Sequence, residues 1–488
     1  MSENFREFPW RIWLLCFLTF ACFYHHEQNS NITTRIALTK AIVDKHELKI
    51  DDFAPYTIDI AKFNGHYYAD KAPGLSLLAI PLLAVAEPWL DLPSNPLKLP
   101  KLDTYLPSYI ALIYIFSLGI VSTATATATA LMFRWCRARG SSTAAATFAS
   151  LAYAFGTPVM WWSTTFFSHA AASAMLLIGY VILSESTLPL VRETDPIDRV
   201  RVARAVLGGF FLGLSFLIEF TAGPAVAIIA FCCAADALRQ RIALDKFIKT
   251  FLFSAVGLLG PMLALAVYNT LTFGSPSHLG YSSVNDFPGM QSGFFGISVP
   301  DLHVARLLLV GQYRGLLMLA PILLLVPFGI WVAFRQSQWR IISIGATLVF
   351  IWYWMMNAGY YYWWGGFSTG PRHITPGLSL LLILLAPLWD RLTPAWRRPA
   401  VLLLACSMLI AVLLTSLEVT APEWTWQPFN DVWLPMLKRL EFPRFVTNAI
   451  GIGGLWGFLP LLAVWLVCGL PIIRMLYTSM QSPRLKAP

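Results

Sequence analysis

Charged residues are scarce in this chain. Asp, Glu, Lys and Arg together make up 12% of its 488 residues, against about 25% in an average soluble domain. Hydrophobic residues make up 57%, and apolar runs of about 20 residues, the length that crosses a bilayer as a helix, recur along the chain. This composition excludes an ordinary soluble domain and predicts an all-α, polytopic protein whose partner is the lipid bilayer.

Other common features are also missing. The seven cysteines lie within or at the ends of apolar segments, without the spacing of a metal site: Cys16, Cys22, Cys136, Cys232, Cys233, Cys406 and Cys468. We expect them to pack as small hydrophobic residues. No glycine-rich loop of the nucleotide-binding type occurs. We therefore expect one integral membrane domain, residues 1–488, without a metal or an organic cofactor. Binding of a single divalent cation between carboxylates stays an open alternative.

Positive charge is in excess, with a net charge of +9. The Lys and Arg residues stand in short clusters between apolar segments, as in RWCRARG (134–140) and DRLTPAWRRP (390–399). Such clusters set orientation in a membrane and do not indicate nucleic acid. If they are cytoplasmic, both termini are cytoplasmic and the number of membrane-spanning helices is even. The apolar segment 72–90 would break this count if it crossed, so we expect it to lie at the outer interface or to be re-entrant.

About twelve candidate spans remain, the first near residues 12–24. A cleaved signal peptide also fits that stretch, but no A-x-A-like site follows it, so a retained helix is favoured. Residues 25–103 then form a long external first loop. Within it, NITTRIALTKAIVDKH predicts an amphipathic, solvated interfacial helix, with Ile36 on its apolar face and Arg35 and Lys40 on others.

Polar clusters gather on the predicted outer face, where ionisable groups at membrane depth usually mark a site. They are centred on His169, Glu219, Arg314, Arg372 with His373, and Glu423. In GGFSTGPRH the glycines let the backbone approach a ligand, and Arg372 offers a fork for phosphate. A lone histidine such as His169 is also typical of a hydrogen-bonded interface position, and interfacial Trp and Tyr residues are often only anchors.

The first loop carries further candidates. Glu27 follows the first helix directly, and Asp59 lies in YTIDIAKF. Either carboxylate is a candidate base, with an ordinary surface charge as the alternative. The string GHYYADKAPG places Tyr67, Asp70 and Lys71 just ahead of the interfacial segment. A lysine there binds a lipid phosphate as a point charge, or else only reaches the interface beside Asp70.

Together these strings resemble the GT-C class of membrane glycosyltransferases, in particular the bacterial relatives of protein mannosyltransferases and of the lipid A aminoarabinose transferase. That class has an acidic motif after the first helix and a Lys-Pro-Pro-Leu-type motif before a second external helix. HHEQNSNITTRIAL and DKAPGLSLL stand at these two places. The resemblance implies Glu27 as the acid and Lys71 as a phosphate ligand. The chain departs from the pattern at His26 and Ala72, and it has His169 where relatives often have a carboxylate.

We therefore expect an inverting glycosyltransferase of the bacterial inner membrane. It takes a sugar from a polyprenyl-phosphate donor and passes it to an acceptor hydroxyl, on a lipid, glycan or protein, at the extracytoplasmic side. Two carboxylates are candidates for the general base: Glu27 and Asp59. Three side chains are candidates for the phosphate site: Lys71, Arg372 and His373. Three more are expected in the cavity: Asp70, His169 and Tyr67.

Two other functions fit the same composition. One is a transporter or flippase for lipid-linked glycans, and the other is a non-catalytic subunit of an envelope-assembly complex. Transporters often have internal repeats and charged residues near the bilayer midplane. The sequence has no convincing internal repeat and its unusual charges gather at one face, which favours the enzyme.

Overall fold

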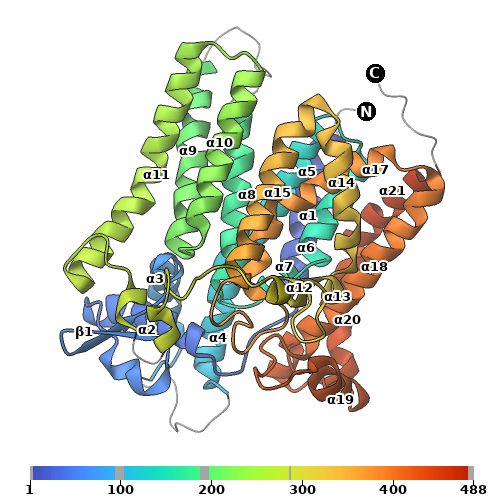
Figure 1. The fold of residues 1–488 in the computed structure, drawn as a ribbon. Helices are drawn as coiled ribbons and strands as arrows, with labels where there is room; N and C mark the ends of the chain where they lie inside the picture. The colour runs from blue at the N-terminus through green and yellow to red at the C-terminus, as the bar shows by residue number, and fades with distance from the viewer. Residues whose placement is uncertain (1–3, 94–103, 187–196, 285–286, 482–488) are drawn as a thin grey trace.

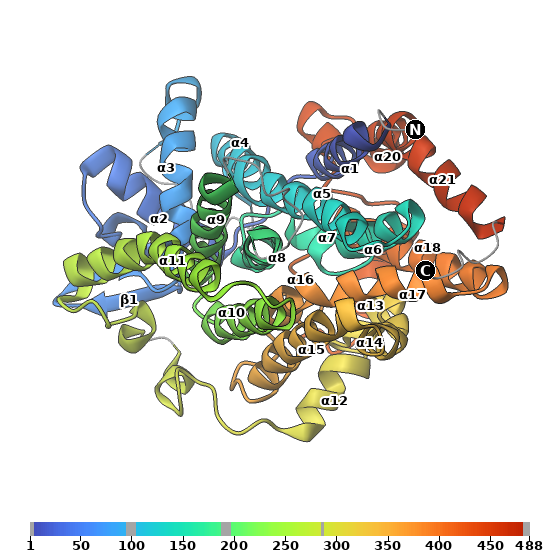
Figure 2. The ribbon, with the colours of Figure 1, turned by 90° about the horizontal axis from the view of Figure 1, so that it is seen from above.

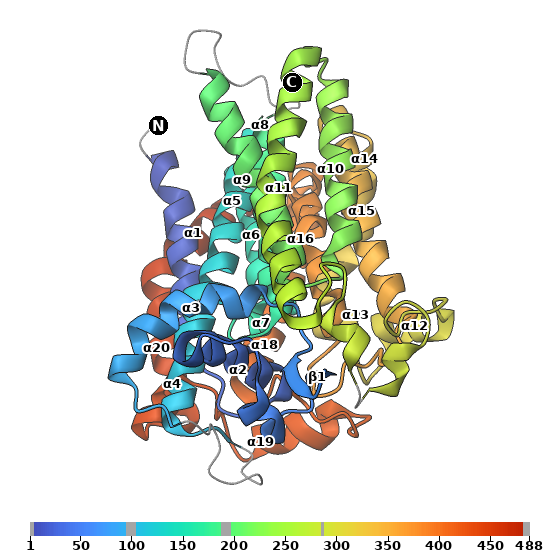
Figure 3. The ribbon, with the colours of Figure 1, turned by 90° about the vertical axis from the view of Figure 1, so that its left-hand side faces the viewer.

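The long helices of the chain run side by side as a bundle, as Figures 1 and 3 show. The structure is a computed structural model and describes residues 4–93, 104–186, 197–284 and 287–481. The helices of the bundle are α1 (Asn4–Ala21), α4 (Pro107–Phe116), α5 (Thr123–Ala138), α6 (Thr143–Phe155), α8 (Ser168–Ser186), α9 (Ile197–Ile218), α10 (Ala222–Arg239), α11 (Leu244–Phe273), α14 (Val326–Phe334), α15 (Ser337–Ala358), α16 (Leu378–Leu381), α17 (Leu385–Arg391), α18 (Pro394–Leu417), α20 (Phe458–Val464) and α21 (Leu470–Gln481). The other helices are α2 (Ser30–Lys45), α3 (Gly74–Ala86), α7 (Val159–Trp162), α12 (Leu302–Val310), α13 (Leu316–Leu319) and α19 (Leu434–Lys438).

Nine helical stretches among the described residues are long and apolar enough to cross a membrane. Some join several elements: α4 continues through a π-helical segment, Ser117–Ser122, into α5. Three shorter apolar helices, Phe8–Ala21, Thr143–Phe155 and Pro321–Phe334, run along the same bundle. Together these stretches match the spans predicted from hydropathy, and the all-α, polytopic fold is confirmed.

One further apolar helix lies across the bundle. Figure 2 looks down the bundle and shows α3 from the side, and Figure 3 shows it crosswise to the long helices. This is the orientation expected of the interfacial segment 72–90. Its first residue, Gly74, packs so closely on the end of α9 that an added Cβ would lie 2.6 Å from the carbonyl oxygen of Leu217. The start of α3 is therefore fixed against the end of α9.

The first loop also contains a β-hairpin, which the sequence did not predict. Strands β1 (Ile60–Phe63) and β2 (His66–Ala69) are antiparallel. The turn residues Asn64 and Gly65 have φ of 49° and 82°, the conformation in which Asn-Gly closes a two-residue hairpin. Residues 94–103 of the predicted loop 25–103 lie outside the described residues.

The register of this hairpin places two acidic residues together. Ile60 pairs with Ala69. Asp59 precedes β1 and Asp70 follows β2, so the two carboxylates leave the same end of the hairpin.

The predicted amphipathic helix is present as α2, but its polar face is not solvated. Arg35 is 2% exposed and Lys40 is 4% exposed. Lys40 Nζ forms ion pairs with Asp44 at 2.8 Å and Glu87 at 3.3 Å. The prediction of a solvated helix is wrong, because α2 packs against α3 and strand β2, and all its residues from Asn31 to Ala41 are buried.

We expect the hairpin end of the bundle to be extracytoplasmic, since the basic clusters lie toward the other end. Ser292 and Ser337 are both exposed, Ser292 in the segment after α11 and Ser337 at the start of α15. In a background with the exposed Cys406 changed to Ser, an impermeant thiol reagent should modify a Ser292→Cys variant in intact cells. A Ser337→Cys variant should react only after permeabilisation. Labelling of Ser337→Cys in intact cells would reverse the orientation.

Candidate functional site

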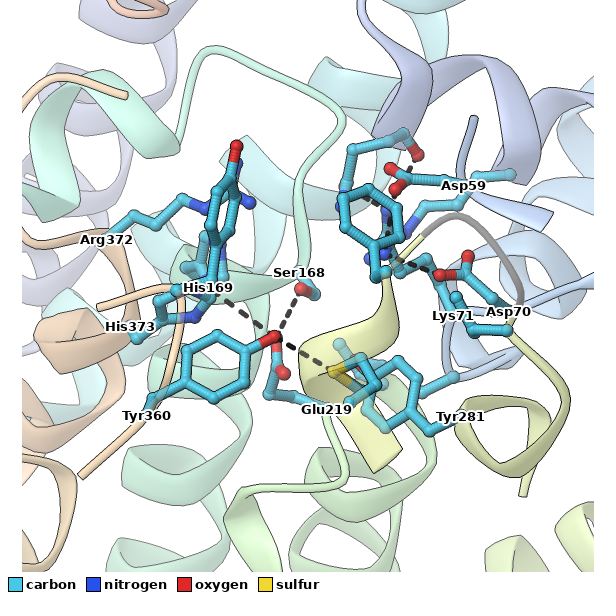
Figure 4. Close-up of a pocket in the computed structure, with 18 of the residues that line it drawn as sticks. Asp59, Asp70, Lys71, Ser168, His169, Glu219, Tyr281, Tyr360, Arg372 and His373 are labelled. Carbon is cyan, nitrogen blue, oxygen red and sulfur yellow. Dashed lines mark hydrogen bonds and ion pairs between the residues drawn. The ribbon is translucent and has the colours of Figure 1, made fainter. Parts of the chain in front are cut away.

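A polar cavity of about 640 Å³ lies where the first loop meets the bundle. Figure 4 shows that the first loop supplies one side and the segment after α15 supplies the other, with the start of α8 and the α9–α10 corner between them. Its charged and imidazole side chains are Arg35, Asp59, Asp70, Lys71, His169, Glu219, Arg372 and His373. The fold thus gathers ionisable groups from four separate parts of the chain.

Lys71 lies between two carboxylates. Its Nζ is 2.8 Å from Asp70 Oδ2 and 3.1 Å from Asp59 Oδ1. Burial alone would lower the pKa of Lys71, but Asp59 and Asp70 outweigh that effect and raise it, so the ammonium stays charged. Burial raises the pKa of Asp70 to about 6, because desolvation exceeds the attraction of Lys71. We call these three residues the ion triad.

Glu219 is a third carboxylate in the cavity. It lies in the corner between α9 and α10 and is 8% exposed. The hydroxyl of Ser168 donates a hydrogen bond to Glu219 Oε2, and His169 Nδ1 lies 3.4 Å from the same oxygen. The ring of His373 meets that of His169 edge-on, with 5.3 Å between centres. Within the described residues no Lys or Arg lies at ion-pair distance from Glu219.

The segment 360–373 brings cations in from the opposite side. Three of its glycines have positive φ, a conformation that favours glycine: Gly365, Gly366 and Gly370. The turns return Arg372 to the cavity, where its guanidinium lies over the ring of Phe167 at 5.7 Å. Arg372 Nε and His373 Nε2 are buried and have no hydrogen-bond partner among the described residues. Such donors suit an anionic ligand.

A third cation, Arg35, comes from α2. It donates to the backbone oxygen of Asn31 at 2.7 Å, and its Nε has no partner in the part of the chain that the structure describes. Three cations and three carboxylates therefore line the cavity. Lys71 is engaged by the ion triad, whereas Arg35 and Arg372 form no ion pair with any described carboxylate. These two arginines can hold a phosphate without losing a partner.

Most of the side chains predicted from sequence meet in this cavity: Asp59, Asp70, Lys71, His169, Arg372 and His373. Tyr67 does not line it; its ring lies 5.7 Å from Lys62 Nζ. Glu219 was recognised from sequence only as the centre of a polar cluster and was not assigned a role, although its place between two apolar helices was a signal. Arg35 was also missed, because its helix was interpreted as solvated.

Glu27 lies outside the cavity, against the segment that follows α18. Its Oε2 accepts a hydrogen bond from Thr420 Oγ1 at 3.1 Å, and its carboxyl group is hydrogen-bonded to Glu418. Burial, and then the contact with Glu418, raises the pKa of Glu27 to about 9. Near neutral pH Glu27 therefore keeps a proton in its contact with Glu418, while Arg444 lies close by. This pair links the first loop to the segment that follows α18.

Within the described residues, no three His, Cys, Asp or Glu side chains are grouped so that they could hold a metal ion. A metal-free site stays a prediction.

The sequence matches no family model and no curated protein. Its fold, however, is similar to solved structures. ArnT from Cupriavidus metallidurans in the apo state aligns with a TM-score of 0.53 and 13% identity, over 98% of this chain and 75% of that chain. ArnT bound to undecaprenyl phosphate aligns with a TM-score of 0.52 and 14% identity, over 85% of this chain and 65% of that chain. The chain thus spans about two thirds of the length of the ligand-bound ArnT. The similarity confirms the GT-C type of fold.

The proton that Glu27 shares with Glu418 predicts how the stability of the fold depends on pH. Because the pKa of Glu27 is higher in the folded protein, this proton stabilises the fold fully below the ordinary pKa of 4.5. The stabilisation is lost as the pH rises toward 9. Glutamine imitates the protonated acid at every pH. The melting temperature of the parent should therefore fall more between pH 7 and pH 9.5 than that of a Glu27→Gln variant. A Glu47→Gln variant serves as the control, and equal slopes for parent and Glu27→Gln would contradict the shared proton.

Proposed function

We propose that the protein is an inverting membrane glycosyltransferase of the bacterial inner membrane. It takes a sugar from a polyprenyl-phosphate donor and passes it to an acceptor hydroxyl at the extracytoplasmic end of the bundle. The observation that carries this proposal is the junction of the charged cavity with an apolar one. The fold shared with ArnT, which has been solved with undecaprenyl phosphate bound, adds support.

The apolar cavity has a volume of about 950 Å³. Residues that line both cavities are Glu219, Tyr281, Met290, Tyr360 and His373. The rest of its wall is mainly aromatic and aliphatic and comes from the α9–α10 corner, the segment after α11, and α15. A polyprenyl phosphate has the same division into an anionic head and a long apolar chain. The phosphate fits the charged cavity, and the first isoprene units fit the apolar one.

The reaction needs stabilisation of the leaving phosphate. The acceptor oxygen bonds to the anomeric carbon of the sugar, the bond between that carbon and the phosphate oxygen breaks, and its electron pair leaves with the lipid phosphate. Lys71 and Arg372 lie on opposite sides of the cavity (Figure 4). With His373 they stabilise the charge that develops on the leaving oxygen.

The proton of the acceptor hydroxyl goes to a carboxylate base, for which we propose Asp59. Of the two candidates from sequence, Asp59 lines the cavity and Glu27 does not. Asp59 and Asp70 both form ion pairs with Lys71. A phosphate that attracts Lys71 weakens its ion pair with Asp59, which leaves an oxygen of Asp59 available to accept the proton.

A transporter for lipid-linked glycans would use a similar charged lining. Transporter sites lie typically near the bilayer midplane, between structural repeats. Figure 3 shows the first loop at one end of the long helices, and this loop supplies part of the lining of the charged cavity. This position favours transfer to an acceptor outside the membrane over movement through it. A non-catalytic subunit would have no need of such a charged cavity.

The donor site can be tested with single variants. Lys71→Ala and Arg372→Ala should each lower kcat/KM for a polyprenyl-phosphate sugar by more than roughly tenfold, about 1.4 kcal/mol, since each removes a charge from the leaving group. Lys62→Ala, an exposed lysine on the same hairpin, is the matched control. Initial rates in lipid nanodiscs give the measurement. Parent-like rates in both cavity variants, at normal expression, would remove these residues from the site.

The base can be tested with an isosteric change. Asp59→Asn keeps the shape of the side chain but cannot accept a proton, so the variant should bind the donor and lose transfer by about 100-fold. Asp52→Asn, which changes an exposed carboxylate in the same loop, is the control. Donor binding and sugar transfer are measured on the same preparations. Full transfer by Asp59→Asn would refute the carboxylate role, and donor movement without transfer by the parent would favour the transporter.

A further inference from the structure

A second apolar cavity lies on the far side of the segment 360–373. It has a volume of about 1270 Å³ and is formed by the C-terminal part of α18 together with residues near α13 and α19. Three uncharged amides are part of its lining: Gln312, Gln427 and Asn430. Among the described residues no charged side chain lines it, in contrast to the donor cavity. A ligand that fits it has an apolar part and an uncharged polar part.

An aromatic platform of Phe367, Trp424 and Trp426 adjoins this cavity. Trp424 and Trp426 are each 66% exposed, and Phe367 is 39% exposed. The ring of Trp426 packs on Tyr313 with 4.8 Å between centres. Gln312 precedes Tyr313 and Gln427 follows Trp426 in the chain, and both glutamines line the second cavity. The platform is therefore continuous with the part of the second cavity that these amides line.

A fixed carboxylate stands next to the platform. Glu423 Oε2 accepts hydrogen bonds from the Tyr362 hydroxyl and, at 2.9 Å, from Trp364 Nε1. The hydroxyl of Tyr313 donates to the backbone oxygen of Glu423. Both the carboxylate and its backbone are therefore held in place. Exposed indoles beside an ordered carboxylate suit a sugar, which offers an apolar C–H face and hydroxyl donors.

The segment 360–373 lines the donor cavity and packs against Leu319, a residue of the second cavity. Tyr362 lines the donor cavity and also binds Glu423. Arg314 supports the segment by donating to the backbone oxygens of Trp364 at 3.1 Å and Gly366 at 3.0 Å. On its other face, Gly370 lies so close to Leu319, a residue of the second cavity, that an added Cβ would be 2.6 Å from Leu319 Cδ1. Only the segment 360–373 therefore lies between a ligand on the platform and the donor cavity.

We propose that the second cavity and the aromatic platform bind the acceptor, and that the acceptor is an uncharged glycolipid. Its chain occupies the second cavity, and its sugar lies on the platform with a hydroxyl directed past Tyr362 toward the donor. A phospholipid fits less well, since its phosphate would meet no cation among the described residues that line the cavity. This inference rests on the proposed function. The reaction is the same: the acceptor oxygen bonds to the anomeric carbon, the proton goes to the base, and the lipid phosphate leaves.

Kinetics provide the first test. Leu413→Trp fills the second cavity from α18, and Trp426→Ala removes part of the platform. Each should raise KM for an alkyl glucoside acceptor by about tenfold or more while leaving donor affinity unchanged, because neither residue lines the donor cavity. Controls are Leu409→Trp, which changes an exposed leucine of α18 outside the cavity lining, and Trp456→Ala, whose indole is also 66% exposed. A loss in Trp456→Ala equal to that in Trp426→Ala would identify the indoles as bilayer anchors and overturn the inference.

Direct binding provides a second test that needs no turnover. An alkyl glucoside with a diazirine in its chain should crosslink to α18 in the parent, and Leu413→Trp should lose most of this product while Leu409→Trp keeps it. Polyprenyl phosphate should not compete. Equal crosslinking in parent and Leu413→Trp, or equal competition by phosphatidylcholine, would overturn the glycolipid site. If the parent transfers no sugar but this pattern holds, the proposed transferase fails and the glycolipid site stands.

Discussion

Lys71 carries a buried positive charge between Asp59 and Asp70, and the position of the first loop depends on that contact. The side chains of Lys71, Asp59 and Asp70 are 16%, 11% and 2% exposed. Removing one member of a buried ion pair typically costs about 3–5 kcal/mol, because a charge is left without compensation. The hairpin supplies both carboxylates from one end, so its register and the ion triad support each other.

The remaining parts of the cavity are fixed by close backbone contacts. Gly74 lets the start of α3 touch the end of α9, which brings Lys71 and Glu219 to the same cavity. The glycine turns of the segment 360–373 bring Arg372 in from the other side. Side chains larger than hydrogen at these positions would separate the two halves. Arg372, which forms no ion pair with a described carboxylate, is thereby held on the side of the cavity opposite Lys71, where we propose that a lipid phosphate binds.

Hydropathy and charge were enough to predict the bundle, including the crosswise position of α3. They also singled out Lys71 and Arg372 as charges beside glycines, and the structure places both in one cavity. The partner of Glu27 could not be predicted, because Thr420 and Glu418 lie at the other end of the chain. The role of Arg35 was hidden for a different reason. Helical spacing shows which residues share a face, but it does not show whether a polar face meets water or a buried cavity.

We propose that one lipid phosphate binds between the first loop and the segment 360–373. Cryo-electron microscopy of the protein with polyprenyl phosphate in nanodiscs tests this directly. The phosphate density should lie within hydrogen-bond distance of Lys71 and Arg372, with the isoprenoid chain in the apolar cavity beside Trp352. Phosphate density elsewhere, or a chain that occupies the second cavity instead, would contradict the account.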